Sequence, residues 1–383
     1  MNSRAGLLFL ATLAWNIALG VSHIVVPLYA YELGFSAATI GILFSVPVIG
    51  QLLLGLVGGA TSDRWGGRST LLVACGSFVV APAIFLFTQG FWLFFAGQLL
   101  LILGRAVFWP ASQSLASELP GERSVQMGRL NALVSVGQII GTAGTGLLLA
   151  LAGFQSVFAA LGIFGLAGTL ATLGLPRPPD RRHAAPGALF GHFGPLLRGR
   201  PIYFALVCAF LCAQPVSLGQ SVFPLLLQSL GHTPEAIGPI LALRPAGATI
   251  AILLLARWIG SARGLWYATG AAVLGTSTLI VAPLCTHPVA AGLVVGLMGV
   301  GAGLVLLFYQ LIVSAFSEPH TRGSALAIAG SGWSMSHIVA PFVVGFVAET
   351  TDLTTAFQLW GVGVTLVALS LPWLHRWSHP SPG

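Results

Sequence analysis

The sequence contains no lysine, and charged residues of all kinds make up only 7% of its 383 residues. All sixteen basic residues are arginine, and only nine residues are acidic. A soluble protein of this length would need many more polar side chains to cover its surface. The scarcity of charge therefore excludes an ordinary soluble protein and favours a membrane protein.

Cysteine is also scarce. The four cysteines lie in or at the edge of hydrophobic stretches, and none has a paired spacing in a polar loop. We therefore predict no disulfide framework. Cys208 and Cys212 are one helical turn apart, but small cysteines commonly pack helices, so we expect neither a metal nor a cofactor.

Long apolar runs dominate what is present, since 56% of the residues are hydrophobic and the mean hydropathy is +0.92. About twenty apolar residues cross the hydrocarbon core as a helix, because each residue advances the helix by about 1.5 Å. The sequence thus predicts an all-α membrane protein with twelve transmembrane helices. The runs lie at roughly 6–31, 37–60, 69–88, 90–115, 129–152, 154–176, 201–228, 235–257, 264–284, 287–315, 322–348 and 353–374.

The arginines alternate between the loops that join these runs. They occur in the N-terminal segment, in every second loop and in the C-terminal tail, whereas the charges of the intervening loops are all acidic. By the positive-inside rule, loops rich in arginine stay in the cytoplasm. We predict a multi-pass protein of the inner (plasma) membrane with both termini cytoplasmic. The basic pI near 9.9 then reflects topology, and no nucleic acid is expected as a partner.

The longest polar stretch, residues 177–200, divides the runs six and six. It is rich in proline, glycine and arginine and has no long apolar run, which is typical of a linker. The sequence therefore predicts an N-terminal six-helix bundle at 1–176, a cytoplasmic linker at 177–200 and a C-terminal six-helix bundle at 201–383.

The two predicted bundles also contain similar sequence segments in the same order, at an offset close to 195 residues. The loop ELPGERSVQMGRL before the fifth run is similar to SEPHTRGSALAI before the eleventh, which aligns Arg123 with Arg322. A weaker echo relates DRWGGR at 63–68 to ARWIGSAR at 256–263. Two six-helix repeats around a cavity at the membrane midplane are typical of secondary transporters.

These features resemble the major facilitator superfamily (MFS) over nearly the whole chain. The family signature Gly-x-x-x-Asp-Arg-x-Gly-Arg-Arg/Lys is matched at 59–68, with glycine at one basic position. The resemblance implies the MFS fold, in which helices 1, 2, 4, 5, 7, 8, 10 and 11 line the cavity. It also implies a conformational gate, whose candidate residues are Gly59, Asp63, Arg64, Gly66, Arg68, Arg123 and Arg322.

Within this gate, the resemblance places Asp63 at the end of the second helix, facing the start of the eleventh. A carboxylate there meets the positive end of the helix dipole, an interaction of about 0.3–1 kcal/mol when exposed. We interpret Asp63 as a latch that closes the cytoplasmic side. The alternative is that this turn only anchors the topology.

Glycines recur in the fifth run, where family antiporters often carry Gly-x-x-x-Gly-Pro-x-x-Gly-Gly. The spacing is matched loosely, but Thr142 stands where the pattern has proline. The motif therefore does not by itself predict antiport. We expect Gly137, Gly141 and Gly144 to let helices approach closely.

Four ionisable residues lie deep inside predicted spans: His23, Arg105, Arg244 and His337. A charge at this depth costs at least about 2.5–3.5 kcal/mol, so each should face a cavity or a partner. All four lie on helices that the resemblance assigns to the cavity. No acidic residue lies in the hydrocarbon zone to pair with Arg105 or Arg244.

The two arginines, Arg105 and Arg244, can each grip a carboxylate or phosphate through parallel hydrogen bonds. We therefore predict that they bind an anionic substrate from opposite halves, with Trp109, Gln113 and Tyr309 as further candidate contacts. In the alternative, Arg105 bonds helix carbonyls and glutamines and serves structure or gating, and the aromatic side chains only pack helices.

The two histidines are candidates for proton coupling, because histidine is the side chain whose unperturbed pKa, about 6.5, lies near neutrality. His23 and His337 could instead be ordinary hydrogen-bonded packing residues, and a facilitator without proton coupling also stays open.

The sequence thus predicts a secondary active transporter that moves a small organic solute through alternating access. The two arginines favour an anionic solute. A proton-coupled multidrug efflux antiporter is the alternative in the same class, and a membrane sensor that binds a ligand without transport is the alternative from another class. No enzyme is predicted, because the spans lack paired carboxylates, a His–Glu metal motif and a nucleophile elbow. The expected partners are the solute and the bilayer, with protons as a further candidate, and the expected state is a monomer.

Overall fold

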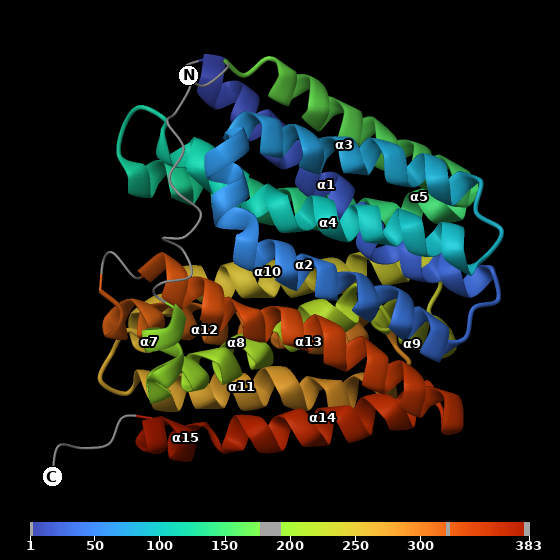
Figure 1. Cartoon of the computed structure of the whole chain (residues 1–383). Helices are drawn as coiled ribbons and strands as arrows, with labels where there is room; N and C mark the ends of the chain where they lie inside the picture. The colour runs from blue at the N-terminus through green and yellow to red at the C-terminus, as the bar shows by residue number, and fades with distance from the viewer. Residues whose placement is uncertain (1–2, 177–192, 319–321, 379–383) are drawn as a thin grey trace, which may run out of the picture. The chain divides into compact units, whose positions relative to one another are not determined.

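The computed structural model describes residues 3–176, 193–318 and 322–378, and every regular element in these ranges is helical (Figure 1). Apolar runs bounded by glycine, proline and polar residues produce this pattern, since Gly34, Gly66, Gly121, Gly153 and Gly231 take positive φ where the chain turns. The helices are α1 (Ser3–Glu32), α2 (Ala37–Trp65), α3 (Gly67–Leu86), α4 (Phe91–Ser117), α5 (Arg123–Leu173), α7 (Phe193–Arg198), α8 (Arg200–Gly219), α9 (Phe223–Ser229), α10 (Pro234–Ile259), α11 (Gly264–Val281), the 3-10 helix η1 (Ala282–Leu284), α12 (Pro288–Phe316), α13 (Arg322–Thr350), α14 (Leu353–Leu369) and α15 (Leu371–Ser378).

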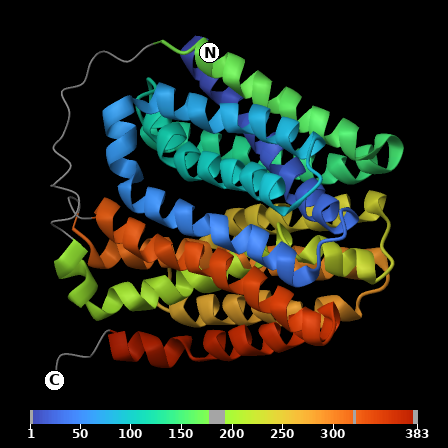
Figure 2. The ribbon, with the colours of Figure 1, turned by 45° about the vertical axis from the view of Figure 1, so that its right-hand side comes forward.

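Ten of the helices in the described ranges are long and apolar enough to span a membrane, and α14 with α15 forms a further pair bent by 43°. Helix α5 has 51 residues and breaks at Gly153, whose φ is 72°. An unbroken helix of that length would be more than twice as long as the hydrocarbon core is thick. Counting its two parts separately gives the predicted twelve spans, and Figure 2 shows α5 doubling back on itself.

The predicted run at 201–228 is wrong as a single helix, because the structure divides it into α8 and α9. Helix α8 ends at Gly219, and Pro224 lies in the first turn of α9. Proline is tolerated at that position and cannot continue a helix that already runs before it. Apolar composition alone cannot reveal such a break, because the residues on both sides of it are hydrophobic.

The contacts between helices group the chain into two compact units. Unit 1 contains residues 1–35, 46–186 and 234–242, and unit 2 contains 36–45, 187–233 and 243–383. Both α2 and α10 thus begin in one unit and continue in the other. Each helix carries a proline just past that boundary, Pro47 and Pro245, where a backbone hydrogen bond is lost and bending costs less. The predicted division into bundles at 1–176 and 201–383 stays a prediction.

In unit 1, α1 and α5 pack with their backbones close together. A Cβ atom on Gly141 would collide with the carbonyl oxygen of Ile17, and one on Gly20 would lie 2.7 Å from the carbonyl oxygen of Gln138. This proximity lets the Gln138 amide donate a hydrogen bond of 3.3 Å to Asn16 Oδ1. Small residues therefore set both the helix spacing and a buried polar contact.

In unit 2, other helices also pack closely at glycines and are joined by a polar contact. A Cβ atom on Gly332 of α13 would collide with the carbonyl oxygen of Leu206 on α8, and Gly301 meets α11 with similar closeness. The Ser336 hydroxyl on α13 donates to Ser217 Oγ on α8 at 3.3 Å. Each unit thus holds its helices by glycine contacts supplemented by polar side chains.

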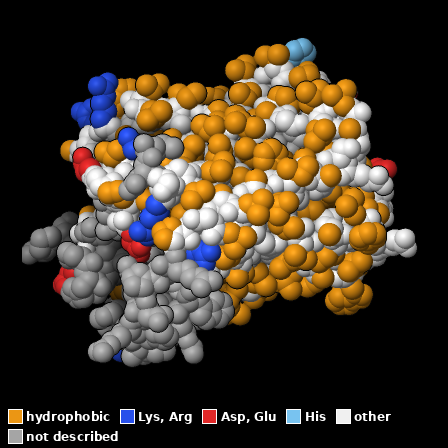
Figure 3. Space-filling view, turned by 90° about the horizontal axis from the view of Figure 1, so that it is seen from above, with side chains coloured by type: hydrophobic (Ala, Val, Ile, Leu, Met, Phe, Trp, Pro, Cys, Tyr) orange, Lys and Arg blue, Asp and Glu red, His pale blue; other side chains and the backbone are white. Residues whose placement is uncertain are grey.

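The outer surface fits a lipid environment. Large apolar side chains are exposed along several helices, among them Leu151 at 76%, Leu253 at 77% and Leu366 at 62%. On the face shown in Figure 3, hydrophobic side chains cover most of the described surface, and the arginines in view gather at one end. This distribution agrees with a multi-pass membrane protein.

Candidate substrate-binding site

Arg105 lies in unit 1 on α4, and the neighbouring turn of that helix is fixed by aromatic packing. The Trp15 indole of α1 stacks on Phe108 with ring centroids 3.6 Å apart, and Trp109 meets it edge-on at 6.2 Å. The Trp15 ring nitrogen donates a hydrogen bond to the Ala74 carbonyl of α3 at 3.2 Å. Helix α1, itself bonded to α3, therefore holds the part of α4 that follows Arg105.

The predicted contacts of unit 1 share one face of this helix. Arg105, Trp109 and Gln113 follow each other at intervals of four residues, which places them above one another on α4. Arg105 and Trp109 are half-buried and Gln113 is exposed. Among the described residues, no acceptor forms a hydrogen bond or ion pair with the Arg105 guanidinium. The face therefore offers a cation, an aromatic ring and an amide to a ligand.

Arg244 lies in unit 2 on α10, one residue before Pro245. A Cβ atom on Gly219, the last residue of α8, would lie 3.7 Å from Arg244 Nε, so the missing side chain leaves room for the guanidinium. The carboxyl end of a helix carries partial negative charge, so α8 partly compensates this cation. The described residues supply no hydrogen bond or ion pair to it, and the side chain is half-buried.

The break between α8 and α9 lies next to this arginine. The Ser221 hydroxyl donates to the Ser217 carbonyl at 2.6 Å, which occupies one of the carbonyls that the helix end leaves open. Irregular backbone inside a membrane is tolerated where it is buried in protein or lines a cavity. The break thus gives Arg244 a polar neighbourhood that the sequence did not predict.

The remaining predicted contact, Tyr309, is half-buried in unit 2 and packs beside an apolar cluster. Its neighbour Phe308 meets Phe204 edge-on at 6.3 Å. The packing of this segment therefore also serves the core of unit 2. The cluster consists of Ile202, Ala205, Val313, Ala325, Ile328 and Ala329.

Both candidate proton-coupling histidines are buried, His23 on α1 and His337 on α13. The His337 Nδ1 atom lies 2.9 Å from the carbonyl oxygen of Trp333 one turn earlier, and the two rings stack at 5.5 Å. This contact fixes the orientation of the imidazole. A role of either histidine in proton coupling stays a prediction.

Most of the predicted gate lies outside the described part of the chain. The side chains of Asp63, Arg64, Arg123 and Arg322 are not described, and neither are the surroundings of Gly59. Gly66, with φ 76°, precedes α3 and makes the turn into it. Arg68 donates a hydrogen bond of 2.8 Å to the carbonyl oxygen of Leu173 at the end of α5. A cation at the carboxyl end of a helix is favourable, so Arg68 joins α3 to α5 within unit 1.

The predicted packing glycines differ among themselves. Gly137 approaches α1 so closely that a Cβ atom would lie 2.8 Å from Asn16 Cβ, and Gly141 is equally close to that helix. Gly144 faces open space, since no atom lies within 4 Å of its Cβ position. Gly146, noted only for its spacing, meets Pro234 at the start of α10 within unit 1.

Three polar contacts escaped the sequence analysis. The Trp360 ring nitrogen donates to Gln214 Oε1 at 2.8 Å, and Asn16 accepts from Gln138 as described above. Glu349 on α13 accepts a hydrogen bond of 3.3 Å from the backbone amide of Ala38 and so caps the start of α2 within unit 2. The polarity of Asn16 inside an apolar run could have been noticed, but partners far apart in sequence could not.

Comparisons with known proteins decide the family. The family model of the Major Facilitator Superfamily matches residues 5–310. The chain belongs to this superfamily. The predicted twelve-helix MFS fold is confirmed.

Several relatives of this MFS protein act on different compounds. The vesicular acetylcholine transporter of Mus musculus is 28% identical over 336 residues, which cover 81% of this chain and 61% of that protein. The chain thus spans about three fifths of the length of that relative. The class C tetracycline resistance protein of Escherichia coli is 26% identical and is covered to 88%, against 89% of this chain.

A solved structure confirms the MFS fold. The nucleoside transporter NupG superposes with a TM-score of 0.78 over 98% of this chain and 100% of that one, at 16% identity. A likeness at this identity concerns the fold alone. The substrates of these relatives differ widely, so the site residues of this chain must supply the argument about its own.

Proposed function

We propose that this transporter carries a small organic solute with an anionic group across the membrane by alternating access. The observation that supports this proposal most strongly concerns two half-buried guanidiniums, those of Arg105 on α4 and Arg244 on α10. Neither has a hydrogen-bond acceptor among the described residues. A guanidinium at membrane depth that lacks a carboxylate partner attracts an anion, because burial makes the uncompensated charge costly. The paired planar donors suit a carboxylate or phosphate.

A proton-coupled drug exporter is the second candidate, and the relationship to the tetracycline resistance protein favours it. In this candidate the histidines exchange protons while the arginines contact polar groups of a larger molecule. The two candidates differ in the charge of the solute and in the effect of a pH gradient. The same proposal includes three further points: both termini lie in the cytoplasm, the protein resides in the inner membrane, and it is a monomer.

The test is flux into proteoliposomes with a panel of organic anions, organic cations and tetracycline, each with and without a pH gradient. We expect anion flux that Arg105→Gln and Arg244→Gln each weaken by about 10- to 100-fold in KM, the loss of one charge-assisted hydrogen bond. Lysine at either position should retain part of the activity, because the charge stays and the planar fork is lost.

The control is Arg129→Gln, which removes an exposed arginine near the start of α5 in unit 1 and should leave flux unchanged. Flux of cations and no anions would reject the proposed anionic substrate. A flux that is insensitive to the pH gradient and to His337→Ala would reject the second candidate as well as the role of that histidine.

A further inference from the structure

The turn between α10 and α11 in unit 2 carries two arginines among exposed aromatic rings. The Arg257 guanidinium lies 5.6 Å above the Trp258 ring, whose centroid is 6.1 Å from that of Tyr267. Arg263 directly precedes α11, and Trp266 follows in the first turn of that helix. Both arginines are exposed, and Trp258, Trp266 and Tyr267 expose 45%, 60% and 42% of their surface.

The described residues do not compensate the charge of this turn. Among them, neither Arg257 nor Arg263 has a carboxylate partner, whereas Arg4 forms an ion pair with Glu118 in unit 1. The sequence echo explains the difference between the repeats. DRWGGR at 63–68 contains an aspartate before its Arg-Trp pair, whereas ARWIGSAR at 256–263 has Ala256 in that place. The second repeat therefore keeps the cations and lacks the acid.

An apolar surface continues from the turn along α10. Ile250 and Leu254 precede Trp258 at intervals of four residues and expose 55% and 66% of their surface. They lie on the same face of the helix as the indole. Leu253, 77% exposed, lies one turn before Arg257 in the same way. The two arginines thus lie at one end of an exposed apolar surface of α10, and aromatic rings lie between the arginines and the aliphatic side chains.

This order of chemistry matches that of a phospholipid molecule. Guanidiniums bind phosphate through parallel hydrogen bonds, and Trp and Tyr prefer the interface between headgroups and hydrocarbon. The cation–π contact with Trp258 uses the ring face and takes none of the N–H donors of Arg257, which can still bind a phosphate. A soluble phosphate would use only the cations and would leave the exposed apolar face without a role.

We propose that the α10–α11 turn is a binding site for the headgroup of an anionic phospholipid. Arg257 and Arg263 bind the headgroup phosphate, Trp258 and Tyr267 lie at the level of the glycerol esters, and an acyl chain lies along Leu254 and Ile250. The site is separate from Arg105 and Arg244 and does not depend on which solute is transported.

Native mass spectrometry of the purified protein in detergent, titrated with phosphatidylglycerol or phosphatidylcholine, tests the site. We expect phosphatidylglycerol to bind in preference to phosphatidylcholine. A charge near the membrane surface strengthens the binding of anionic lipid by about fivefold. The double variant R257Q/R263Q should therefore weaken phosphatidylglycerol binding about 25-fold and should weaken the binding of zwitterionic phosphatidylcholine less, because its choline cation offsets the phosphate charge.

Matched variants separate a built site from general surface charge. R129Q removes one exposed arginine from unit 1 and should leave binding unchanged. Trp258→Leu keeps both arginines and removes the stacking ring, so it should weaken binding severalfold. The thermal unfolding midpoint of every variant without added lipid, measured in the same detergent, verifies that the protein is folded.

Four results would overturn the proposal. The first is equal binding of the two lipids to the wild type. The second is an R129Q variant that loses as much phosphatidylglycerol as R257Q does. The third is displacement of the lipid by millimolar inorganic phosphate, which would identify a simple anion site in place of a lipid site. If R257Q/R263Q binds phosphatidylglycerol as the wild type does, the site is excluded as well.

Discussion

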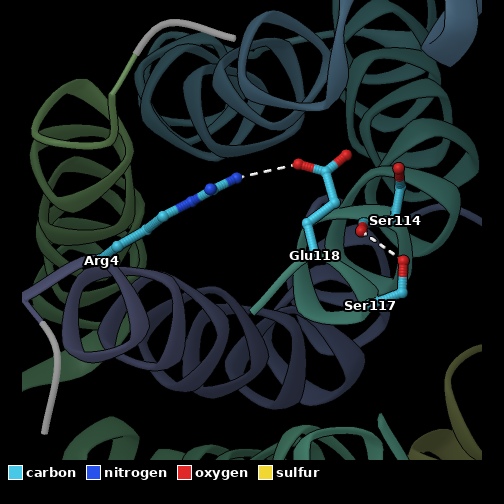
Figure 4. Close-up of polar contacts among 4 residues, drawn as sticks. All are labelled: Arg4, Ser114, Ser117 and Glu118. Atoms are coloured by element: carbon cyan, nitrogen blue, oxygen red, sulfur yellow. Dashed lines mark hydrogen bonds and ion pairs between the residues drawn. The ribbon is translucent and has the colours of Figure 1, made fainter. Parts of the chain in front are cut away.

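In unit 1, Arg4 and Arg68 are held by oxygen atoms of the protein, whereas in unit 2 Arg200 and Arg257 lie over aromatic rings. Arg4 donates to Glu118 Oε2 at 2.9 Å (Figure 4), and Arg68 donates to a helix carbonyl. In unit 2, Arg200 lies 5.4 Å over Trp377, and Arg257 lies over Trp258. An oxygen acceptor compensates the charge within the unit, while a ring leaves the edge of the guanidinium free for an outside anion.

The difference shows that two helical units can share their mode of helix packing and still differ in the partners of the arginines at their helix ends. Both units pack their helices through glycines, so they share the same mode of interior packing. The polar ends differ because Arg4 has a carboxylate partner in Glu118, whereas Arg257 has none among the described residues. The following experiments examine first the shared packing and then the divergent ends.

The largest effect is expected from the glycine contacts, which should matter equally in both units. Gly141→Ala in unit 1 and Gly332→Ala in unit 2 each force a methyl group into a facing backbone, at a cost of about 1–3 kcal/mol in unfolding free energy. Thermal unfolding in detergent measures this loss.

The matched controls are Gly144→Ala and Gly330→Ala, whose Cβ positions face open space. Alanine there should be neutral or stabilise the protein slightly, because it restricts the unfolded chain. A loss confined to one unit would show that the two interiors are not equivalent.

A smaller effect is expected at the arginines. A double-mutant cycle with Arg4→Gln and Glu118→Gln should give a coupling of about 0.2–1 kcal/mol, since side chains that expose 34% and 27% are well screened. The corresponding cycle with Arg200→Gln and Trp377→Leu should give about 0.5–1 kcal/mol. Raising the salt concentration should reduce the Arg4–Glu118 coupling. Absence of that coupling would remove the contrast between the units.

The smallest effect concerns Asp352, which caps α14 in unit 2. Its carboxylate accepts hydrogen bonds from the Thr355 amide at 2.9 Å and hydroxyl at 2.7 Å, which hold the pKa of Asp352 below its usual value of 3.8. A lowered folded-state pKa means that the stabilisation is complete above the unfolded-state pKa and is lost as the pH falls through the folded-state value. The difference in unfolding midpoint between wild type and Asp352→Ala should therefore be constant from pH 5 to 7 and should shrink below about pH 4. A difference that stays constant down to pH 2 would contradict this assignment.

The spans and the family could be predicted because both depend on local composition and one short motif. Apolar length identified the helices, and the signature at 59–68 with the central linker identified the superfamily. The breaks were harder. Gly153 was placed correctly between two runs, but the end of α8 at Gly219 was missed because hydropathy does not change there.

The candidate site was predictable only in its charges. Arg105 and Arg244 stand out because charge is rare in the spans, and the spacing of Trp109 and Gln113 follows from the helix. The position of Arg244 beside the end of α8 requires the fold, since the helix break that creates it is invisible in composition. Long-range partners such as Glu349 for Ala38 could not be found from one sequence.

The passage of α2 and α10 from one unit to the other has a consequence for synthesis. Unit 1 includes residues 234–242, so it lacks one of its segments until the ribosome has also made residues 187–233, which belong to unit 2. Unit 2 in turn uses residues 36–45, which emerge nearly at the start. Neither unit is a continuous stretch of the gene, and a protein cut at the linker would yield two fragments that each expose a surface made for a helix end of the other.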